Sequence, residues 1–167
     1  KTEAEKASRI FQARMGWQPE HTEDKSDAYY VWTGLVLSEG CVSQRKITIG
    51  NSGVVEKAIT YLPECARVRR KDFGNGHVPD WFLYWEDFWN ITENCLAAEK
   101  YVPDWVFRSS NEKIALFLRF LFAGDGWASN HAIGYASTSR RLAEDVSLLL
   151  WRLGIRNTVT EKKPQND

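Results

Sequence analysis

Two carboxylate-glycine pairs are the residues of this sequence whose types and spacing could do chemistry. Glu39-Gly40 and Asp125-Gly126 each follow a long apolar run that predicts a buried helix. A carboxylate at the end of a buried helix is costly unless a cation compensates its charge. If the two helices lie side by side, the paired oxygen ligands predict a site for a hard cation such as Mg²⁺. The alternative is that each acid is exposed at a helix C-terminus, where the helix dipole disfavours it.

A repeat in the sequence puts the two acids at corresponding positions. Glu39 and Asp125 are 86 residues apart, and apolar strand positions share that separation: Ile47 with Ile133 and Ile49 with Tyr135. After one inserted residue, the apolar face of the next helix also matches: Val55, Ile59 and Leu62 with Leu142, Val146 and Leu149. A helix end, a strand face and a helix face in one register indicate an internal duplication about a pseudo-twofold axis.

Hydrophobic periodicity and turn residues predict a similar order of elements in both halves. The first half is expected to contain a helix over 28–38 with Asp27 as its N-cap, strands over 41–44 and 46–50, a helix over 54–62, strands over 67–72 and 81–85, and a helix over 88–96. The second half is expected to contain a helix over 113–124 opened by a capping box of Ser109 and Glu112, strands over 127–130 and 132–137, a helix from Ser139 to Gly154, and a strand over 156–162.

These elements divide the chain into three parts. They are an N-terminal helix with a polar linker over 1–27, a first repeat over 28–98 and a second repeat over 99–167. The second repeat is expected to be truncated at its C-terminus, because its fourth strand and final helix have no counterpart. Its sheet would then end in an open edge, which the helix at 1–15 could cover.

The two apolar runs and their acids resemble a known motif. Residues 32–40 (WTGLVLSEG) and 118–126 (LRFLFAGDG) are each similar to the LAGLIDADG motif. Lys100-Tyr101-Val102-Pro103 resembles the K-x-x-P block that precedes the second motif in intein endonucleases, and residues 133–155 are also similar to this family. Over residues 28–160 the chain therefore resembles a double-motif LAGLIDADG homing endonuclease of the DOD type found in inteins.

The resemblance implies an α+β fold and a nuclease activity. The implied fold is a pseudo-twofold duplicated αββαββα arrangement, with two antiparallel saddle sheets around the two central motif helices. The implied enzyme is a monomer that hydrolyses both strands of double-stranded DNA at a long asymmetric target site. Its implied catalytic residues are Glu39, Asp125 and Lys100, and the set implied to bind Mg²⁺ (or Mn²⁺) is Glu39, Gly40, Asp125 and Gly126.

Lys100 has a physical reason to belong to this site. A cation beside the scissile phosphate stabilises the negative charge that develops there. The alternative is a surface lysine before a proline turn.

Two positions depart from the motif. Glu39 stands where aspartate is usual, although its carboxylate remains a hard oxygen ligand. Phe120 stands where glycine is usual, so Gly34 and Ser38 of the other helix must accommodate its ring, or the helices must lie further apart. Either departure can impair activity while the fold stays intact.

Polar and basic strand residues are expected to contact DNA, because their donors and acceptors match base edges and phosphates. This predicted DNA-binding set is Gln44, Arg45, Lys46, Thr48, Arg67, Arg69, Arg70, Asn130, His131 and Tyr135. The alternative for each residue is a solvent-facing strand position. Because the second sheet is expected to be shorter, the half-site under residues 41–85 is expected to dominate affinity.

Composition bounds the class of protein. The chain has 167 residues, of which 43% are hydrophobic, which predicts a folded protein with a real core. Its net charge of zero gives no overall attraction for nucleic acid, but residues 67–71 form a basic cluster. The three cysteines lack metal-ligand spacing, and no apolar run is long enough to span a membrane. We therefore expect a cytoplasmic location, or association with DNA in a nucleoid or nucleus.

Two other functions use the same fold. A catalytically impaired LAGLIDADG DNA-binding module is disfavoured by the presence of both motif acids, and an RNA-binding maturase is disfavoured by the K-x-x-P block. Signatures of serine hydrolases and nucleotide-binding enzymes do not occur in the sequence. Any intein splicing domain fused to this one is expected to lie outside these residues, because the sequence starts with Lys1 and does not end in His-Asn.

Overall fold

The computed structural model describes residues 22–90 and 96–161. The helix expected at 1–15 lies outside the described residues. The helix expected at 88–96 is described as α4 (Glu86–Asn90), and residues 91–95 lie outside. Within the described ranges no helix is long and apolar enough to cross a membrane.

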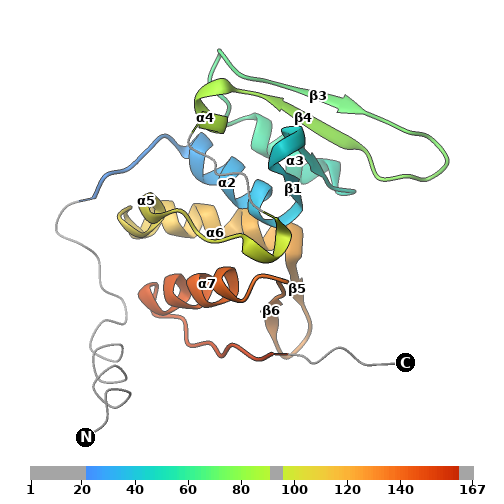
Figure 1. Cartoon of the computed structure of the whole chain (residues 1–167). Helices are drawn as coiled ribbons and strands as arrows, with labels where there is room; N and C mark the ends of the chain where they lie inside the picture. Colours follow the sequence, from blue (N-terminus) through green and yellow to red (C-terminus); the bar gives the residue numbers. More distant parts are fainter. Residues whose placement is uncertain (1–21, 91–95, 162–167) are drawn as a thin grey trace, which may run out of the picture.

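Two long helices lie side by side at the centre of the molecule (Figure 1). They are α2 (Asp27–Glu39) and α6 (Asn111–Asp125). At their N-terminal ends, Lys113 forms an ion pair with Asp27, and the Asp24 carboxylate accepts hydrogen bonds from the Ser110 amide at 2.8 Å and hydroxyl at 2.7 Å. The partners in both contacts are 86 residues apart in sequence. This is also the separation of Glu39 and Asp125, so the two helices contact each other at corresponding positions of the two halves.

Gly34 and Gly124 allow the two helices to approach closely. A Cβ added at Gly34 would lie 2.7 Å from the backbone oxygen of Phe117, and one added at Gly124 would lie 2.3 Å from Ser38 Oγ. Each crossing position thus pairs a glycine on one helix with a larger residue on the other. This arrangement also explains Phe120: its Cβ lies beside Gly34, and its ring is buried against Tyr61 with centroids 5.9 Å apart. The glycine accommodates Phe120 without separating the helices.

The first half builds a four-stranded antiparallel sheet on one side of α2. Its strands are β1 (Gly40–Cys41), β2 (Lys46–Thr48), β3 (Arg67–Lys71) and β4 (Asp80–Tyr84), in the order β1-β2-β4-β3. A short 3-10 helix (Val42–Gln44) and α3 (Ser52–Ile59) complete this half with α4. Trp32, Val55, Trp81 and Phe88 are among the residues of its core.

The second half begins with a 3-10 helix (Ala97–Glu99) and α5 (Asp104–Phe107). After α6 come β5 (Gly126–Ala128), β6 (Ile133–Tyr135) and α7 (Arg140–Arg152). Strands β5 and β6 form a two-stranded antiparallel sheet. Tyr30, Phe117, Leu142 and Leu149 belong to a second core, formed by residues of α2, α6 and α7. The expected α+β class with antiparallel sheets is confirmed.

Several element boundaries differ from those expected. The N-cap of α2 is Ser26 rather than Asp27, and the N-cap of α6 is Ser110, whose side chain accepts from the Lys113 amide. Ser109 is instead fully buried, and its hydroxyl hydrogen-bonds with the Tyr30 hydroxyl at 2.7 Å. The strand expected at 41–44 ends at Cys41, where a 3-10 turn begins. The expected N-cap Ser139 of α7 is confirmed.

The expected alignment of Ile47 with Ile133 is wrong. In the first hairpin Gly40 pairs with Ile47, whereas in the second hairpin Gly126 pairs with Tyr135. The second hairpin therefore has one more pair of facing residues than the first. Corresponding positions are then 88 residues apart, as are the N-caps of α3 and α7 at Asn51 and Ser139. The apolar face of α3 shifts with this register: Ala58 is buried and Ile59 is exposed.

The strand expected at 156–162 is also wrong over its described part, because residues 156–161 form no strand. In the first sheet, β3 hydrogen-bonds only to β4, and β4 joins it to β2. The described part of the second half has no counterpart of β4. A third strand there lacks the neighbour whose backbone groups it would pair with.

Candidate active site

The acids Glu39 and Asp125 meet where α2 and α6 end together. A Cβ added at Gly124 would lie 2.9 Å from Glu39 Cγ, so the two helix ends are in direct contact. Burial raises the pKa of both carboxyls, and the charge of Asp125 raises the pKa of Glu39 further. The Lys100 ammonium opposes both shifts. Two carboxylates that repel each other in a partly dry site are suited to share a cation.

Lys100 lies beneath this pair, with only 7% of its surface exposed. Its Nζ lies 2.9 Å from the carbonyl oxygen of Leu37 and 3.2 Å from that of Gly40, with longer contacts to the carbonyls of Val36 and Ser38. Carbonyls at a helix C-terminus lack partners within the helix and carry partial negative charge. Lys100 therefore caps α2 as well as lying near both acids.

Residues of α7 and its N-cap hold the Lys100 segment in place. The Ser139 hydroxyl donates to the Lys100 carbonyl at 2.5 Å, and the Val102 amide donates to Asp145 Oδ2 at 2.9 Å. Val102 itself is buried in the second core. The K-x-x-P block thus reaches the acids from the second half of the molecule.

The glycines after the acids have a steric role. A Cβ at Gly40 would lie 2.5 Å from the Val36 carbonyl oxygen, and one at Gly126 would lie 2.3 Å from that of Phe122. Both glycines also donate an N–H to these carbonyls and start a strand. Any larger residue would push the strand away from the helix end, and with it the adjacent carboxylate.

The donor set fits a hard cation that shares its coordination with other ligands. Glu39 and Asp125 supply carboxylate oxygens, the type of donor that Mg²⁺ and Mn²⁺ prefer. Among the described residues, no group of three or more His, Cys, Asp or Glu side chains could hold a metal. A metal here would therefore need oxygen ligands from water, backbone or a bound phosphate.

The outer face of the first sheet carries a basic surface. Directly opposite residues of an antiparallel ladder share a face, and Lys46, Phe82 and Arg69 form one such row. Thr48, Asp80 and Lys71 form the next row, and Tyr84 and Arg67 form a third. We call this set the outer face: Lys46, Thr48, Arg67, Arg69, Lys71, Asp80, Phe82 and Tyr84. Four predicted DNA-binding residues, Lys46, Thr48, Arg67 and Arg69, lie on it.

Asp80 neutralises part of this surface. Its carboxylate accepts hydrogen bonds from Lys46 Nζ at 2.5 Å and Thr48 Oγ1 at 2.6 Å. Burial by itself would raise the pKa of Asp80, but these two hydrogen bonds and the charges of Lys46 and Lys71 lower it. Lys46 is therefore held in a fixed position, whereas Arg69 and Lys71 are exposed.

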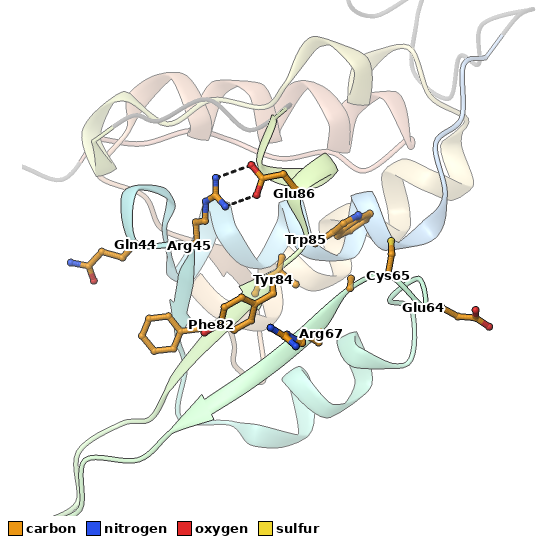
Figure 2. A pocket seen from close by; sticks show the side chains of 11 residues that line it. Gln44, Arg45, Glu64, Cys65, Arg67, Phe82, Tyr84, Trp85 and Glu86 are labelled. Carbon is orange, nitrogen blue, oxygen red and sulfur yellow. Dashed lines mark hydrogen bonds and ion pairs between the residues drawn. The ribbon is translucent and has the colours of Figure 1, made fainter.

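Three other predicted DNA-binding residues of the first half lie elsewhere. Arg70 is on the opposite side of β3, where its guanidinium covers the Trp81 ring at 5.3 Å and pairs with Asp72. Arg45 and Gln44 line a hollow of about 600 Å³ at the end of the sheet (Figure 2). There the Arg45 guanidinium pairs with the Glu86 carboxylate through contacts of 2.6 and 3.1 Å.

The second sheet places its predicted residues on two sides. Asn130 and His131 are exposed in the turn between β5 and β6. Tyr135 faces the helices instead, with its ring 5.4 Å from that of Phe122. Burial, and next the charge of Asp125, raise the pKa of Tyr135. Asn130 and His131 are thus accessible to a ligand, and the Tyr135 ring is part of the packing beneath the sheet.

Comparison with known protein families finds a match in the second half of the chain. Residues 112–167 match the LAGLIDADG-like domain. This part of the chain is therefore similar to that domain family. The match includes α6, its terminal Asp125, both strands of the second sheet and α7. It agrees with the resemblance of residues 118–126 to a LAGLIDADG motif.

Segments of several larger proteins are similar to this chain. RecA of Mycobacterium tuberculosis is 36% identical over 76 residues, which are 41% of the chain and 10% of that protein. The replicative DNA helicase DnaB of Synechocystis is 41% identical over 77 residues, 42% of the chain and 9% of the helicase. A DNA gyrase protein of Mycobacterium kansasii is 28% identical over 140 residues, 73% of the chain and 25% of the gyrase protein. The chain thus spans a quarter or less of these relatives.

Two residues of the LAGLIDADG-like domain that support the site were not predicted in this role. Ser139 was predicted only as a helix N-cap, and Asp145 was not singled out. Both lie in or beside α7 and bind backbone groups of residues 100–102. The sequence did offer a signal for Asp145. It is an acidic residue directly before Val146, which belongs to the buried face of α7.

Proposed function

We propose that this chain is a site-specific DNA endonuclease of the LAGLIDADG homing class, which hydrolyses phosphodiester bonds in both strands of a long asymmetric target. The observation that carries the proposal is the meeting of Glu39 and Asp125 at the ends of two packed helices, with the buried Lys100 ammonium beside them. We propose further that the two halves arose by duplication and that the chain acts as a monomer.

The protein residues would divide the chemistry between them. A divalent metal, Mg²⁺ or Mn²⁺, would polarise the scissile phosphate and activate water when bound. Glu39 and Asp125 would hold it, and the two acids suit two cuts because each belongs to a different half. Lys100 would hold the Glu39 end of α2 rigid and supply positive charge near the developing phosphorane.

DNA would lie across the outer face of the first sheet and the corresponding face of the second. The exposed Arg67, Arg69 and Lys71 supply phosphate contacts on the first side. Strands β3 and β4 form a protruding ribbon (Figure 1), and a DNA major groove admits a two-stranded ribbon. The second sheet has two short strands, so we propose that the first half-site dominates affinity.

The relatives support an endonuclease that resides in unrelated hosts. They are named as RecA, a replicative DNA helicase and a DNA gyrase subunit, and each is similar to this chain over a quarter of its length or less. A segment shared by proteins of such different names is best explained as an inserted module with its own activity. We propose that this module is an intein endonuclease, with its splicing domain outside these residues.

A metal-dependent cleavage selection tests the proposal. The chain is incubated with a randomised DNA library, with and without Mg²⁺, and cut molecules are sequenced. The expected result is double-strand cleavage at one enriched site, only when Mg²⁺ is present. Enrichment of bound but uncut DNA would instead identify a non-cleaving DNA-binding module, and selective binding of structured RNA would identify a maturase.

Arg69 and Arg70 provide a matched test of the DNA interface. Arg69→Ala should weaken binding of the selected site and reduce the salt dependence by about one phosphate contact, because Arg69 is exposed on the outer face. Arg70→Ala should change affinity little, because its guanidinium covers Trp81 on the opposite side. Binding titrations at several salt concentrations measure both effects. Equal losses for the two variants would contradict this orientation of the sheet.

A further inference from the structure

Trp127 is an exposed tryptophan two residues after Asp125 on strand β5. More than half of its surface, 53%, is accessible to solvent. Tryptophan is usually largely buried, so an exposed indole beside a candidate active site needs a reason. Its place in the ladder shows which way the ring faces.

The ring lies on the side of the second sheet that faces away from the helices. Gly126 pairs with Tyr135, and the Tyr135 ring packs toward Phe122 on α6. Trp127 pairs with Gly134, the next position along the ladder, so these two residues share the opposite face. In the first sheet the corresponding pair is Cys41 and Lys46, and Lys46 belongs to the outer face.

The absence of a side chain at Gly134 allows the indole to lie against the sheet. A Cβ added at Gly134 would lie 2.3 Å from both Cε2 and Cζ2 of Trp127. The indole therefore rests on the backbone of β6. A side chain at position 134 would occupy the space that the indole fills. A ring supported from beneath and exposed above loses little conformational freedom when it contacts a ligand.

We propose that Trp127 is a DNA-contact residue of the second half-site, whose indole packs on a deoxyribose or a groove edge next to the phosphate cut at Asp125. This inference rests on the proposed function. An apolar platform suits this sheet, since the pair Trp127 and Gly134 stands where the first half has Cys41 and the cation Lys46. A contact to the sugar carries no sequence information, so it would position the duplex without reading it.

Binding measurements on four proteins test this role. They are the parent, Trp127→Ala, Trp127→Phe and Ile133→Ala, each titrated without divalent metal against the duplex from the cleavage selection. Ile133 is the matched control, because it is 77% exposed on the same sheet but belongs to the Tyr135 side. Loss of the indole should weaken binding about tenfold, the size of effect expected for a tryptophan anchor in a binding interface. Trp127→Phe and Ile133→Ala should bind nearly as well as the parent.

A second variant tests the geometry without removing the ring. Gly134→Ala should displace the indole and weaken binding as Trp127→Ala does, while thermal unfolding shows whether the sheet is intact. Parent-like affinity of Trp127→Ala would overturn the inference and leave the proposed function standing. Parent-like affinity together with a changed sedimentation coefficient would assign Trp127 to a protein contact and overturn it too. If the parent neither binds nor cuts DNA, the proposed function fails and this inference fails with it.

Discussion

Glu39→Gln and Asp125→Asn should each abolish DNA cleavage while leaving DNA binding largely intact. Each substitution replaces a carboxylate with a neutral amide of the same shape, so the helix ends stay packed but lose a charged metal ligand. Single-turnover cleavage of the selected site measures the loss, and a binding titration measures the remaining affinity. Cleavage by either variant within about tenfold of the parent rate would remove that acid from the proposed metal site.

The stability of these variants separates catalysis from folding. Because the pKa of each carboxyl is raised in the fold, the charged form is destabilised there relative to the unfolded chain. In metal-free solution the amide variants should therefore be at least as stable as the parent at neutral pH. That advantage should disappear as the pH falls below the ordinary carboxyl pKa. Glu112→Gln, at the exposed opposite end of α6, is the control and should leave both cleavage and stability nearly unchanged.

Lys100→Met should reduce the cleavage rate of bound DNA by a factor on the order of 10² or more, with little change in affinity. Methionine keeps most of the buried stem but removes the ammonium that lies near both acids. The same ammonium donates to carbonyls at the C-terminus of α2, so the free energy of unfolding should also fall, by about 1–3 kcal/mol. Rapid-quench cleavage and chemical denaturation measure the two effects.

Lys113→Met is the matched control for Lys100. Lys113 is also partly buried between α2 and α6, and its ion pair with Asp27 raises its pKa, but it lies at the far end of the helices. The Lys113→Met variant should be less stable than the parent but should cut DNA at the parent rate. If the two variants lose cleavage equally at temperatures where both are folded, Lys100 acts only as a helix cap. If Lys100→Met weakens binding but bound DNA is cut at the parent rate, Lys100 is only a phosphate contact.

The sequence by itself determined the two acids and the helices that carry them. The length of the two apolar runs predicts buried helices, and each carboxylate-glycine pair marks the helix end, because glycine allows a sharp change of direction. Both glycines have that steric role in the structure. Strands over residues 67–72 and 81–85 were also predicted from the sequence, and these two segments pair with each other as β3 and β4.

Only the tertiary structure decided how far the two halves differ. The alignment of 86 residues fails in the second hairpin, because one added ladder pair shifts the register by two residues while leaving the strand pattern readable. Arg69 and Arg70 look alike in sequence, yet the pleat of β3 sends them to opposite sides. The strand expected at 156–162 would need a neighbouring strand to pair with, and the local sequence pattern does not show whether that strand exists.

The role of Lys100 and the fit of Phe120 likewise depended on contacts between distant segments. Lys100 lies about sixty residues from the carbonyls that it caps, and no local pattern encodes that contact. Phe120 fits because Gly34 faces it across the helix pair and lets its ring turn toward Tyr61. Local periodicity determines which residues are buried, whereas packing between helices determines which residues they meet.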